Sequence, residues 1–585
     1  MPTNIKSAKS PKNTESINGS ILKSALEKKQ LEKFLNVDYG IIGRTAATKY
    51  EPHTSTQFHL WLTSAERTGG EQVAKNIEIG NIVAALSDTY DEVTFGTVVE
   101  MRVYADAESF LSDFTSHDFG DAGVEVPTDV AEVVVVTCDV LRNFSARAKP
   151  VGRSRVYYPS AQGIQYAFNL VDEDGNHDAA TAPIPLGLYE NGDGTVAAIA
   201  VDEAFLVGPE GAHINVSGIS GLASKTSALQ FLTLSLLTHS KKRLAVLAFN
   251  VKSKDLLYLD QANPRLLTDS WSLDAYRALD IPPRPLTQAR FFAPADPTEP
   301  TRTQSLRRLP TQRIEWDLAS IYRDIPTLFN PLDWDDKLAG VWSSIEGEIE
   351  HGNILSYAQM LTWIDRLIDS ANNARPPQQW VRGNHISTWL KARSHLQRFP
   401  LAFKGLIATA GAGTDIPWSQ FGDRSVYVID IQMLSDAGKR LVFSRAINAV
   451  REMLEAGTLE LDGVLVIADE LNKFAPATGE RSPLKEQLVD ITARGRSIGL
   501  ILCGAEQFVS SVDKQIVENS ATHLYGRTGV NELRAPNYSA LSDEVKGKLS
   551  TLAQGRLLVQ SARLPQSVFM RFPLPPCVAG DQFQP

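Results

Sequence analysis

The chain has 585 residues, too many for one ordinary hydrophobic core, and 43% of them are hydrophobic while 22% are charged. This balance is typical of two or three globular domains. Lysine and arginine total 58 against 68 aspartates and glutamates, which gives a net charge of −10. The charge excludes a generally basic protein that coats nucleic acid, but it does not exclude one local basic surface.

The cysteines and the hydrophobic runs indicate the cellular compartment of the protein. Cys138, Cys503 and Cys577 lie far apart in no C-x-x-C pattern, which argues against a disulfide framework or a zinc module. No run approaches the roughly 18 apolar residues that a membrane span needs, and the amino terminus lacks the apolar core of a signal peptide. We therefore expect a cytoplasmic protein that is not embedded in a membrane.

The amino-terminal third of the chain predicts a tail followed by a β domain. Residues 1–50 are expected to form a flexible tail, rich in Lys, Ser and Asn, and a short helix from Ile21 to about Leu35. Residues 55–205 contain short β-branched runs such as EVTFGTVVEMRVYA and EVVVVTCDV, separated by turn residues. This pattern favours a small β-barrel.

The remaining chain predicts an α/β fold that is interrupted by helices. Residues 206–268 read as strand, glycine-rich turn, buried helix and strand, which is a βαβ unit. Residues 269–405 carry Trp, Leu and Ile at helical spacing after a proline-rich stretch, and they predict a helical insertion. Residues 406–585 resume the alternation with strands VYVIDI, VLVIAD and GLILCG. We expect the two α/β parts to share one parallel sheet.

The turn between the first strand and helix of the βαβ unit is a candidate phosphate loop. Backbone N–H groups and the helix dipole at such a turn can hold phosphate oxygens, Lys225 would reach the β- and γ-phosphates, and the Thr226 hydroxyl would bind Mg²⁺. The turn departs from G-x-x-x-x-G-K-[ST], because a serine precedes the lysine and Gly218 lies one residue further from the lysine than the first glycine of the motif. An ordinary Gly-Ser turn that caps a helix is the alternative. The predicted nucleotide contacts are Gly218, Gly221, Leu222, Ala223, Ser224, Lys225, Thr226 and Ser227.

A second candidate element is the acidic end of the strand VLVIAD. Asp469 can complete the Mg²⁺ shell, while Glu470 can orient or deprotonate a water beside the γ-phosphate. Many strands end in acidic loop residues, but the lysine-bearing turn upstream makes an NTPase the favoured interpretation. Gln507, after the next strand, is predicted to sense the γ-phosphate. Asp430, after VYVID, is interpreted as structural.

These motifs together resemble a known family. HINVSGISGLASKTS, VLVIADELNKFAP and SPLKEQLVDITARGRSIGLILCGAEQF are similar to the HerA-type ATPases, motors of the FtsK/HerA branch of RecA-like proteins. The similarity covers most of residues 205–265 and 405–575, and the preceding β region looks like that family's amino-terminal barrel. The resemblance implies a RecA-like P-loop core that uses ATP and Mg²⁺. It also implies a homohexameric ring with double-stranded DNA in a central channel.

The resemblance further implies an arginine that reaches from one subunit to the γ-phosphate of the next. The candidates are Arg494, Arg496, Arg527 and Arg398, and the sequence does not choose among them. We expect a DNA translocase or helicase motor that works with a partner nuclease or other effector, in DNA end processing or antiviral (anti-phage) defence. Two alternatives stay open. One is an ATP-bound hexameric scaffold that does not translocate, and the other is a conjugation- or secretion-type ATPase.

Overall fold

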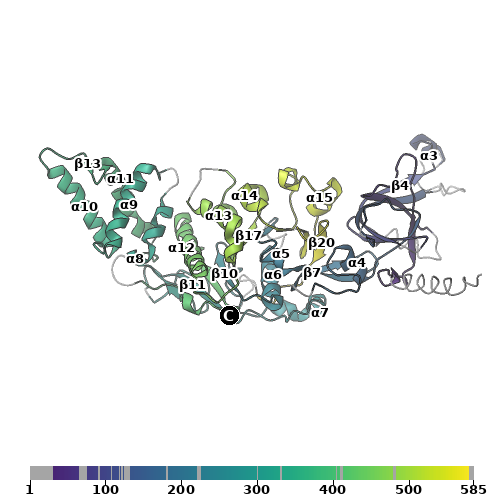
Figure 1. Cartoon of the computed structure of the whole chain (residues 1–585), viewed down its shortest axis with the longest axis horizontal. Coiled ribbons are helices and arrows are strands. Elements are labelled where there is room, and N and C mark those ends of the chain that lie inside the picture. The colour runs from purple at the N-terminus through teal and green to yellow at the C-terminus, as the bar shows by residue number, and fades with distance from the viewer. Residues whose placement is uncertain are drawn as a thin grey trace, which may run out of the picture.

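The computed structural model describes most of the chain as an elongated molecule (Figure 1). A barrel lies at one end, a helical region lies at the other, and a large sheet lies between them. The described residues are 31–64, 76–89, 92–106, 108–116, 119, 123, 132–145, 147–178, 182–219, 225–299, 301–329, 333–403, 405–408, 413–478 and 483–578. The predicted tail and most of the predicted helix from Ile21 to Leu35 lie outside these residues. No helix within them is both long and apolar enough to cross a bilayer.

Six antiparallel strands close the predicted barrel, in the order β1-β2-β5-β4-β3-β6. Side chains of Phe58, Leu60, Val98 and Val136 alternate with outward-facing ones and fill its interior without contact to water. The first strand begins before residue 55, within the segment expected to be tail and helix. The strands are β1 (Ile41–Thr45), β2 (Gln57–Leu62), β3 (Ile82–Ser87), β4 (Val93–Ala105), β5 (Glu132–Asn143) and β6 (Ser154–Tyr157).

The barrel ends at Tyr157, well before the expected boundary at residue 205. The next two strands, β7 (Pro183–Glu190) and β8 (Val196–Asp202), form a hairpin that joins the large sheet through strand β20 (Val568–Arg571). Local alternation and the turn at Asn191 predict the hairpin but not the sheet that it extends, because that pairing involves residues almost 400 positions away.

The large sheet contains twelve strands of the described residues, in the order β12-β11-β15-β10-β16-β17-β9-β18-β19-β20-β7-β8. The first eight are parallel and the last four form an antiparallel extension. Both predicted α/β parts therefore contribute to one sheet, as expected. The strands not yet given are β9 (Ile214–Ser217), β10 (Leu244–Asn250), β11 (Ala289–Pro294), β12 (Gln312–Ile314), β15 (Val426–Asp430), β16 (Gly463–Asp469), β17 (Leu500–Glu506), β18 (Thr522–Tyr525) and β19 (Arg556–Ser561).

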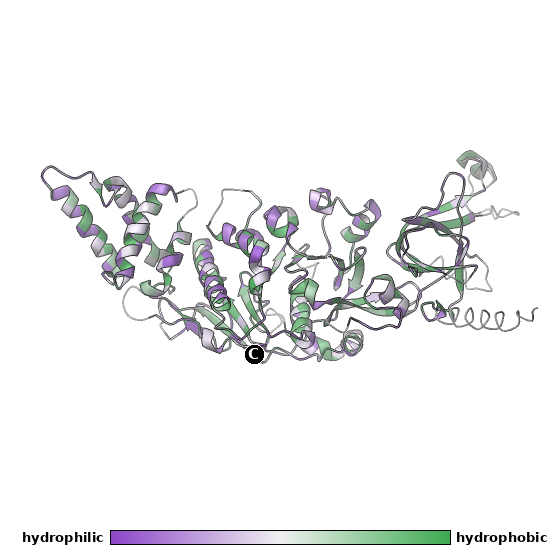
Figure 2. Ribbon diagram, viewed as in Figure 1, coloured by the Kyte–Doolittle hydropathy of each residue, from purple (hydrophilic) through white to green (hydrophobic). Residues whose placement is uncertain are grey.

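Helices cover both faces of the parallel part, which explains why its strands are hydrophobic throughout. One face packs on α6 (Lys225–His239) and α7 (Ser270–Ala278), and the other packs on α12 (Asp436–Glu455) and α13 (Pro483–Ile498). Strand β10 shows the alternation, since Val246 and Ala248 belong to the first core while Leu247 and Phe249 belong to the second. Figure 2 shows hydrophobic strands at the centre and polar outer surfaces on the helices.

The region between residues 269 and 405 is only partly the helical insertion that the sequence predicted. The proline-rich stretch contains β11, which with β12 extends the edge of the parallel sheet. A short edge strand next to prolines has too few alternating residues to stand out in the sequence. The helices that follow are α8 (Leu318–Ile321), α9 (Asp336–Glu350), α10 (Tyr357–Asn373) and α11 (Ile386–Ala402), with a small ribbon of β13 (Trp380–Val381) and β14 (Asn384–His385). Shorter helices elsewhere are α3 (Phe110–Ser116), α4 (Ala161–Ala167), α5 (Glu203–Leu206), α14 (Lys514–Glu518) and α15 (Asp543–Ser550).

Candidate functional site

The predicted phosphate turn and the acidic strand end meet at the carboxyl edge of the parallel sheet. Strand β9 leads into the turn, strand β16 ends in the two carboxylates, and β17 lies between them. All three strands run in the same direction, so their carboxyl ends share one edge. In open α/β sheets this edge is where ligands bind.

Lys225 is the first residue of α6, and its ammonium folds back over the turn. Its Nζ donates a hydrogen bond to the Gly218 carbonyl at 2.8 Å, and the residue is only 9% exposed. Gly218 has φ +141°, which favours glycine at this exit from the strand. Burial lowers the pKa of Lys225, and the carboxylates of Asp469, Glu470 and Glu506 act in the opposite direction. Of the other predicted contacts, Gly221, Leu222, Ala223 and Ser224 lie outside the described residues.

Asp469 and Glu470 lie beside the lysine in two different environments. Burial raises the pKa of Asp469 to about 6, although the Lys225 charge opposes this effect, and Asp469 Oδ1 accepts a hydrogen bond from the Glu470 amide at 2.9 Å. Glu470 has φ +58° and ψ +47°, a left-handed conformation that is unfavourable for a residue with a Cβ. Its carboxylate is 3.2 Å from the Lys252 ammonium and 3.9 Å from that of Lys473.

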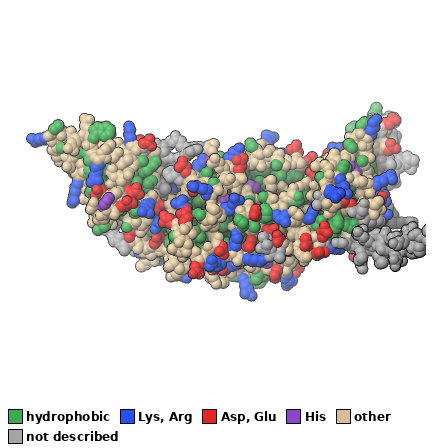
Figure 3. Space-filling model, viewed as in Figure 1, with side chains coloured by type: hydrophobic (Ala, Val, Ile, Leu, Met, Phe, Trp, Pro, Cys, Tyr) green, Lys and Arg blue, Asp and Glu red, His purple; other side chains and the backbone are tan. Residues whose placement is uncertain are grey.

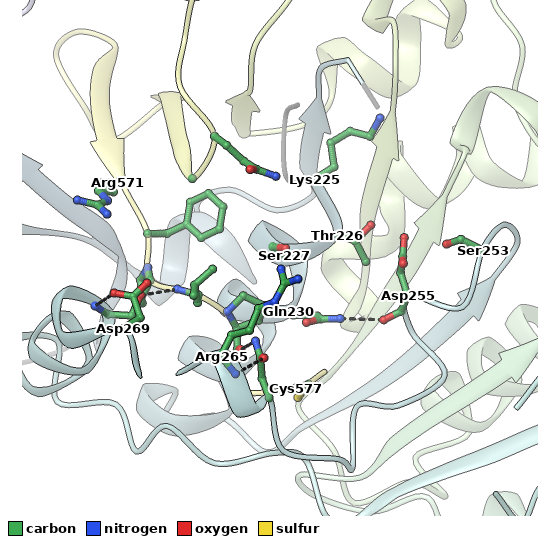
Figure 4. Close-up of a pocket in the computed structure, with 18 of the residues that line it drawn as sticks. Lys225, Thr226, Ser227, Gln230, Ser253, Asp255, Arg265, Asp269, Arg571 and Cys577 are labelled. Atoms are coloured by element: carbon green, nitrogen blue, oxygen red, sulfur yellow. Dashed lines mark hydrogen bonds between the residues drawn. The ribbon is translucent and has the colours of Figure 1, made fainter. Parts of the chain in front are cut away.

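One cavity of about 500 Å³ brings these residues together. Lys225, Thr226, Ser227, Asp469 and Glu470 all line it, so these five predicted residues lie at a single site. Figure 4 shows Lys225 and Thr226 at one end of the pocket and Arg571 and Asp269 at the other. The far end is built by the start of α7 and by the segment that follows β20, which the sequence did not predict to be near the site.

The strand order and the helices on both faces decide the fold. It is an α/β fold with a largely parallel central sheet. No protein-family model matches the chain, and no curated protein is significantly similar to it in sequence.

Solved structures that match the chain include three proteins. VirB4 of Thermoanaerobacter pseudethanolicus is 14% identical with a TM-score of 0.43, and the alignment covers 69% of this chain and 98% of that one. The bacterial conjugative coupling protein TrwB is 12% identical with a TM-score of 0.40, covering 64% and 87%. The genome packaging NTPase B204 from Sulfolobus turreted icosahedral virus 2, in complex with ATPγS, is 19% identical with a TM-score of 0.21, covering 26% and 69%. Similarities at this level assign no role to individual residues.

The other described predicted residues, which are Gly218, Gln507 and the four candidate arginines, are not among the residues that line the cavity. Gln507 follows β17 at the correct edge of the sheet and is half-buried. Arg527 follows β18 at the same edge, and its Nε donates to the Ser550 carbonyl at 3.1 Å. Arg494 and Arg496 are at the end of α13, where the chain enters β17, and so they are at the opposite edge of the sheet.

Arg494 pairs with Asp490, and Arg496 Nη1 donates to the Glu210 carbonyl at 3.2 Å. The fourth candidate arginine, Arg398, is exposed on α11, in the helical region. The proposed roles of Gln507 and of the four arginines stay predictions.

Several charged residues at or near the site did not stand out in the sequence, among them Lys252 and Glu506. Lys252, two residues after β10, lines the cavity and pairs with Glu470. Glu506 at the end of β17 is 1% exposed, and neither of its carboxylate oxygens has a hydrogen-bond partner among the described residues. Burial raises the pKa of Glu506 to about 8, with the Asn215 side chain and Lys225 opposing. The strand ends that carry both residues were visible in the sequence, but the order of the strands was not.

Asp430 has the structural role that the sequence suggested. It is buried at the end of β15, and its carboxylate accepts hydrogen bonds from the Asn250 amide at 3.0 Å, the Ser305 hydroxyl at 2.7 Å and the Leu306 amide at 3.1 Å. These bonds fix the loop before β12 against the sheet. Asp430 is not among the residues that line the cavity.

Proposed function

We propose that this chain is a Mg²⁺-dependent ATP hydrolase of the FtsK/HerA type that acts as a DNA-translocating motor. The observation that carries the proposal is the cavity that joins Lys225 and Thr226, on the first turn of α6, with Asp469 and Glu470 at the end of β16. A lysine and a helix amino terminus bind phosphate oxygens. Two adjacent carboxylates supply one group for a metal and one for a water.

Each residue has a defined part in hydrolysis. The Lys225 ammonium leaves the Gly218 carbonyl and binds the β- and γ-phosphates of ATP, whose negative charges attract it. Glu470 accepts a proton from a water whose oxygen forms a new bond to the γ-phosphorus. The bond between that phosphorus and the β–γ bridging oxygen breaks, its electron pair stays on ADP, and inorganic phosphate is the second product.

The residues present fit a Mg²⁺ ion. Mg²⁺ prefers oxygen ligands and is usually held by one or two protein groups together with phosphates and water. The Thr226 hydroxyl and the Asp469 carboxylate line the same cavity and are such groups. When bound, the ion would offset the charge that builds up on the phosphate oxygens.

The distribution of charge removes one objection to a DNA ligand. Residues 105–132, from the end of β4 to the start of β5, contain eight carboxylates and no Lys or Arg, so subtracting −8 from the net −10 leaves −2 for all the other residues. On the face shown in Figure 3, acidic and basic side chains are interspersed. The DNA-binding surface we propose is a channel in a homohexamer, where six copies of each basic residue would converge on the phosphates.

The assembly and its partner belong to the same proposal. A HerA-like hexamer with a nuclease or other effector, in DNA end processing or antiviral defence, is the specific form we favour. The ATP-bound scaffold and the conjugation-type ATPase are the two competing forms.

The decisive experiment compares the wild-type chain with Glu470→Gln. The variant should bind ATP with Mg²⁺ as tightly as the wild type but hydrolyse it at least a hundredfold more slowly, since the amide cannot accept the proton. Glu460→Gln, at an exposed position just before β16, is the matched control and should hydrolyse normally. Hydrolysis by Glu470→Gln at the wild-type rate would contradict the assignment of the base.

Double-stranded DNA then separates the forms of the proposal. A motor should hydrolyse ATP faster when duplex DNA is added and should displace a third strand from a triplex. An assembled particle whose ATP hydrolysis ignores DNA would instead be the scaffold. Purification together with envelope proteins would favour the conjugation-type ATPase.

A further inference from the structure

The Lys252–Glu470 pair is a feature of the cavity that the proposed reaction does not yet explain. Lys252 Nζ is 3.2 Å from Glu470 Oε1, and both residues line the cavity with Thr226. The Glu470 side chain is 15% exposed while that of Lys252 is 51% exposed. The lysine is therefore the more accessible member of the pair, and the carboxylate is the more buried one.

The backbone on both sides of the pair is held in an unfavourable conformation. Ser253, next to Lys252, has φ +59°, and Glu470 itself has φ +58°. A left-handed conformation costs a residue with a Cβ about 1–3 kcal/mol and persists only where neighbours hold it. Here the neighbour is Asn250, whose side-chain amide donates to the Ser253 carbonyl at 3.1 Å and to Asp430 at 3.0 Å. The loop that carries Lys252 is thus fixed to the sheet edge, while the lysine side chain is half exposed to solvent.

Adjacent strands place Lys252 and Glu470 side by side at the carboxyl edge of the sheet. Strands β10 and β16 are paired, with Phe249 opposite Ala468, so their carboxyl ends lie side by side. Figure 4 shows Ser253 on the same side of the pocket as Thr226. A γ-phosphate positioned for attack by a water on Glu470 would lie between these two ends. Without a cation there, the carboxylate and the phosphate would repel each other.

We propose that Lys252 is a catalytic residue that moves from Glu470 to the γ-phosphate when ATP binds. In the ligand-free chain it pairs with the carboxylate, and in the ATP complex it contacts a γ-phosphate oxygen and leaves Glu470 free to accept the proton of the attacking water. The pair thereby makes the base available only when a γ-phosphate is present. This inference rests on the proposed ATPase function.

The test measures the affinities of Lys252→Ala for ADP and for the ATP analogue AMPPNP, each with Mg²⁺, and its kcat and KM for ATP. ADP affinity should change less than twofold, because ADP lacks the γ-phosphate. AMPPNP affinity should fall about tenfold and kcat by at least tenfold, since a charge-assisted contact is lost. Lys252→Arg should recover part of both losses, and Lys252→Gln should behave as the alanine variant does.

Lys473→Ala is the matched control. Lys473 also faces Glu470, at 3.9 Å, but it does not line the cavity. Its removal should leave the ratio of AMPPNP to ADP affinity unchanged. A Lys252→Ala variant with the wild-type ratio would overturn the inference even if the wild type hydrolyses ATP. A wild-type chain that binds neither nucleotide would overturn the ATPase proposal itself.

Discussion

Asp469, the carboxylate that we propose binds Mg²⁺, provides a quantitative test of the site, because its burial should destabilise the ligand-free protein. Burial raises its pKa from 3.8 to about 6. Near neutral pH the carboxylate is charged in a place that disfavours charge. Asp469→Asn removes the charge, and the Asn carbonyl can still accept the hydrogen bond from the Glu470 amide.

The expected change in the free energy of unfolding follows from the pKa shift of Asp469. The folded protein binds the proton more tightly than the unfolded chain does between pH 3.8 and 6, so the free energy of unfolding falls as the pH rises through this range. At about 1.4 kcal/mol per pKa unit, the total reaches at most about 3 kcal/mol above pH 6. Water that reaches the partly exposed carboxylate reduces this value. Asp469→Asn should therefore stabilise the ligand-free protein near pH 7, and about half of the gain should remain at pH 5.

Denaturant unfolding at pH 5, 6 and 7 measures the difference between variant and wild type. Asp430→Asn is the matched control, since it makes the same substitution at the same sheet edge. Its carboxylate already accepts hydrogen bonds from Asn250, Ser305 and Leu306, so the amide should destabilise the protein by about 1–3 kcal/mol. Asp469→Asn should also lose Mg²⁺-dependent binding of ATP. If Asp469→Asn were destabilising at pH 7, or if its effect did not vary with pH, the reasoning would be refuted.

Two further substitutions test the interior. Glu506→Gln should preserve the fold. Because the raised pKa of about 8 favours the protonated acid in the folded state, the wild type should lose stability relative to this variant by about 1.4 kcal/mol per pH unit between pH 6 and 8. Parallel curves of unfolding free energy against pH for the two proteins would contradict this. Arg307→Met should cost about 3–5 kcal/mol in unfolding free energy, because it leaves the Asp260 carboxylate, 2.7 Å from the guanidinium, without its partner in a poorly solvated place. The exposed pair of Arg277 and Asp274 is the control, and Arg277→Met should have little measurable effect on the same unfolding curve.

The sequence predicted most of the parallel core because local patterns determine it. The predicted strands VYVIDI, VLVIAD and GLILCG are found as β15, β16 and β17, with bounds that differ by at most two residues. What the patterns left out is pairing between distant segments. The β7–β8 hairpin was assigned to the barrel, although it joins the sheet through β20. An alternating strand carries the same signal whichever neighbour it pairs with.

The site was predictable where its residues are close in sequence and not where the fold brings them together. Lys225 and Thr226 follow from a strand, a turn and a helix, and Asp469 and Glu470 follow from one buried strand. Lys252 could be predicted as a site residue only once β10 was known to lie next to β16. The far wall of the cavity, at Arg571, could be placed only once strand β20 was known to join the sheet, and β20 begins almost 350 residues after Lys225.

The carboxylates along this edge differ in how well their surroundings stabilise them. The Asp430 carboxylate accepts hydrogen bonds from Asn250, Ser305 and Leu306. Burial disfavours the charged form of Asp469, the Glu506 carboxylate has no hydrogen-bond partner among the described residues, and Glu470 has a left-handed backbone conformation beside an exposed lysine. These unfavourable features gather around the cavity of Lys225, where a phosphate and a metal would relieve them. Ligand binding should therefore stabilise this protein most at the residues whose environment is least favourable in the ligand-free state.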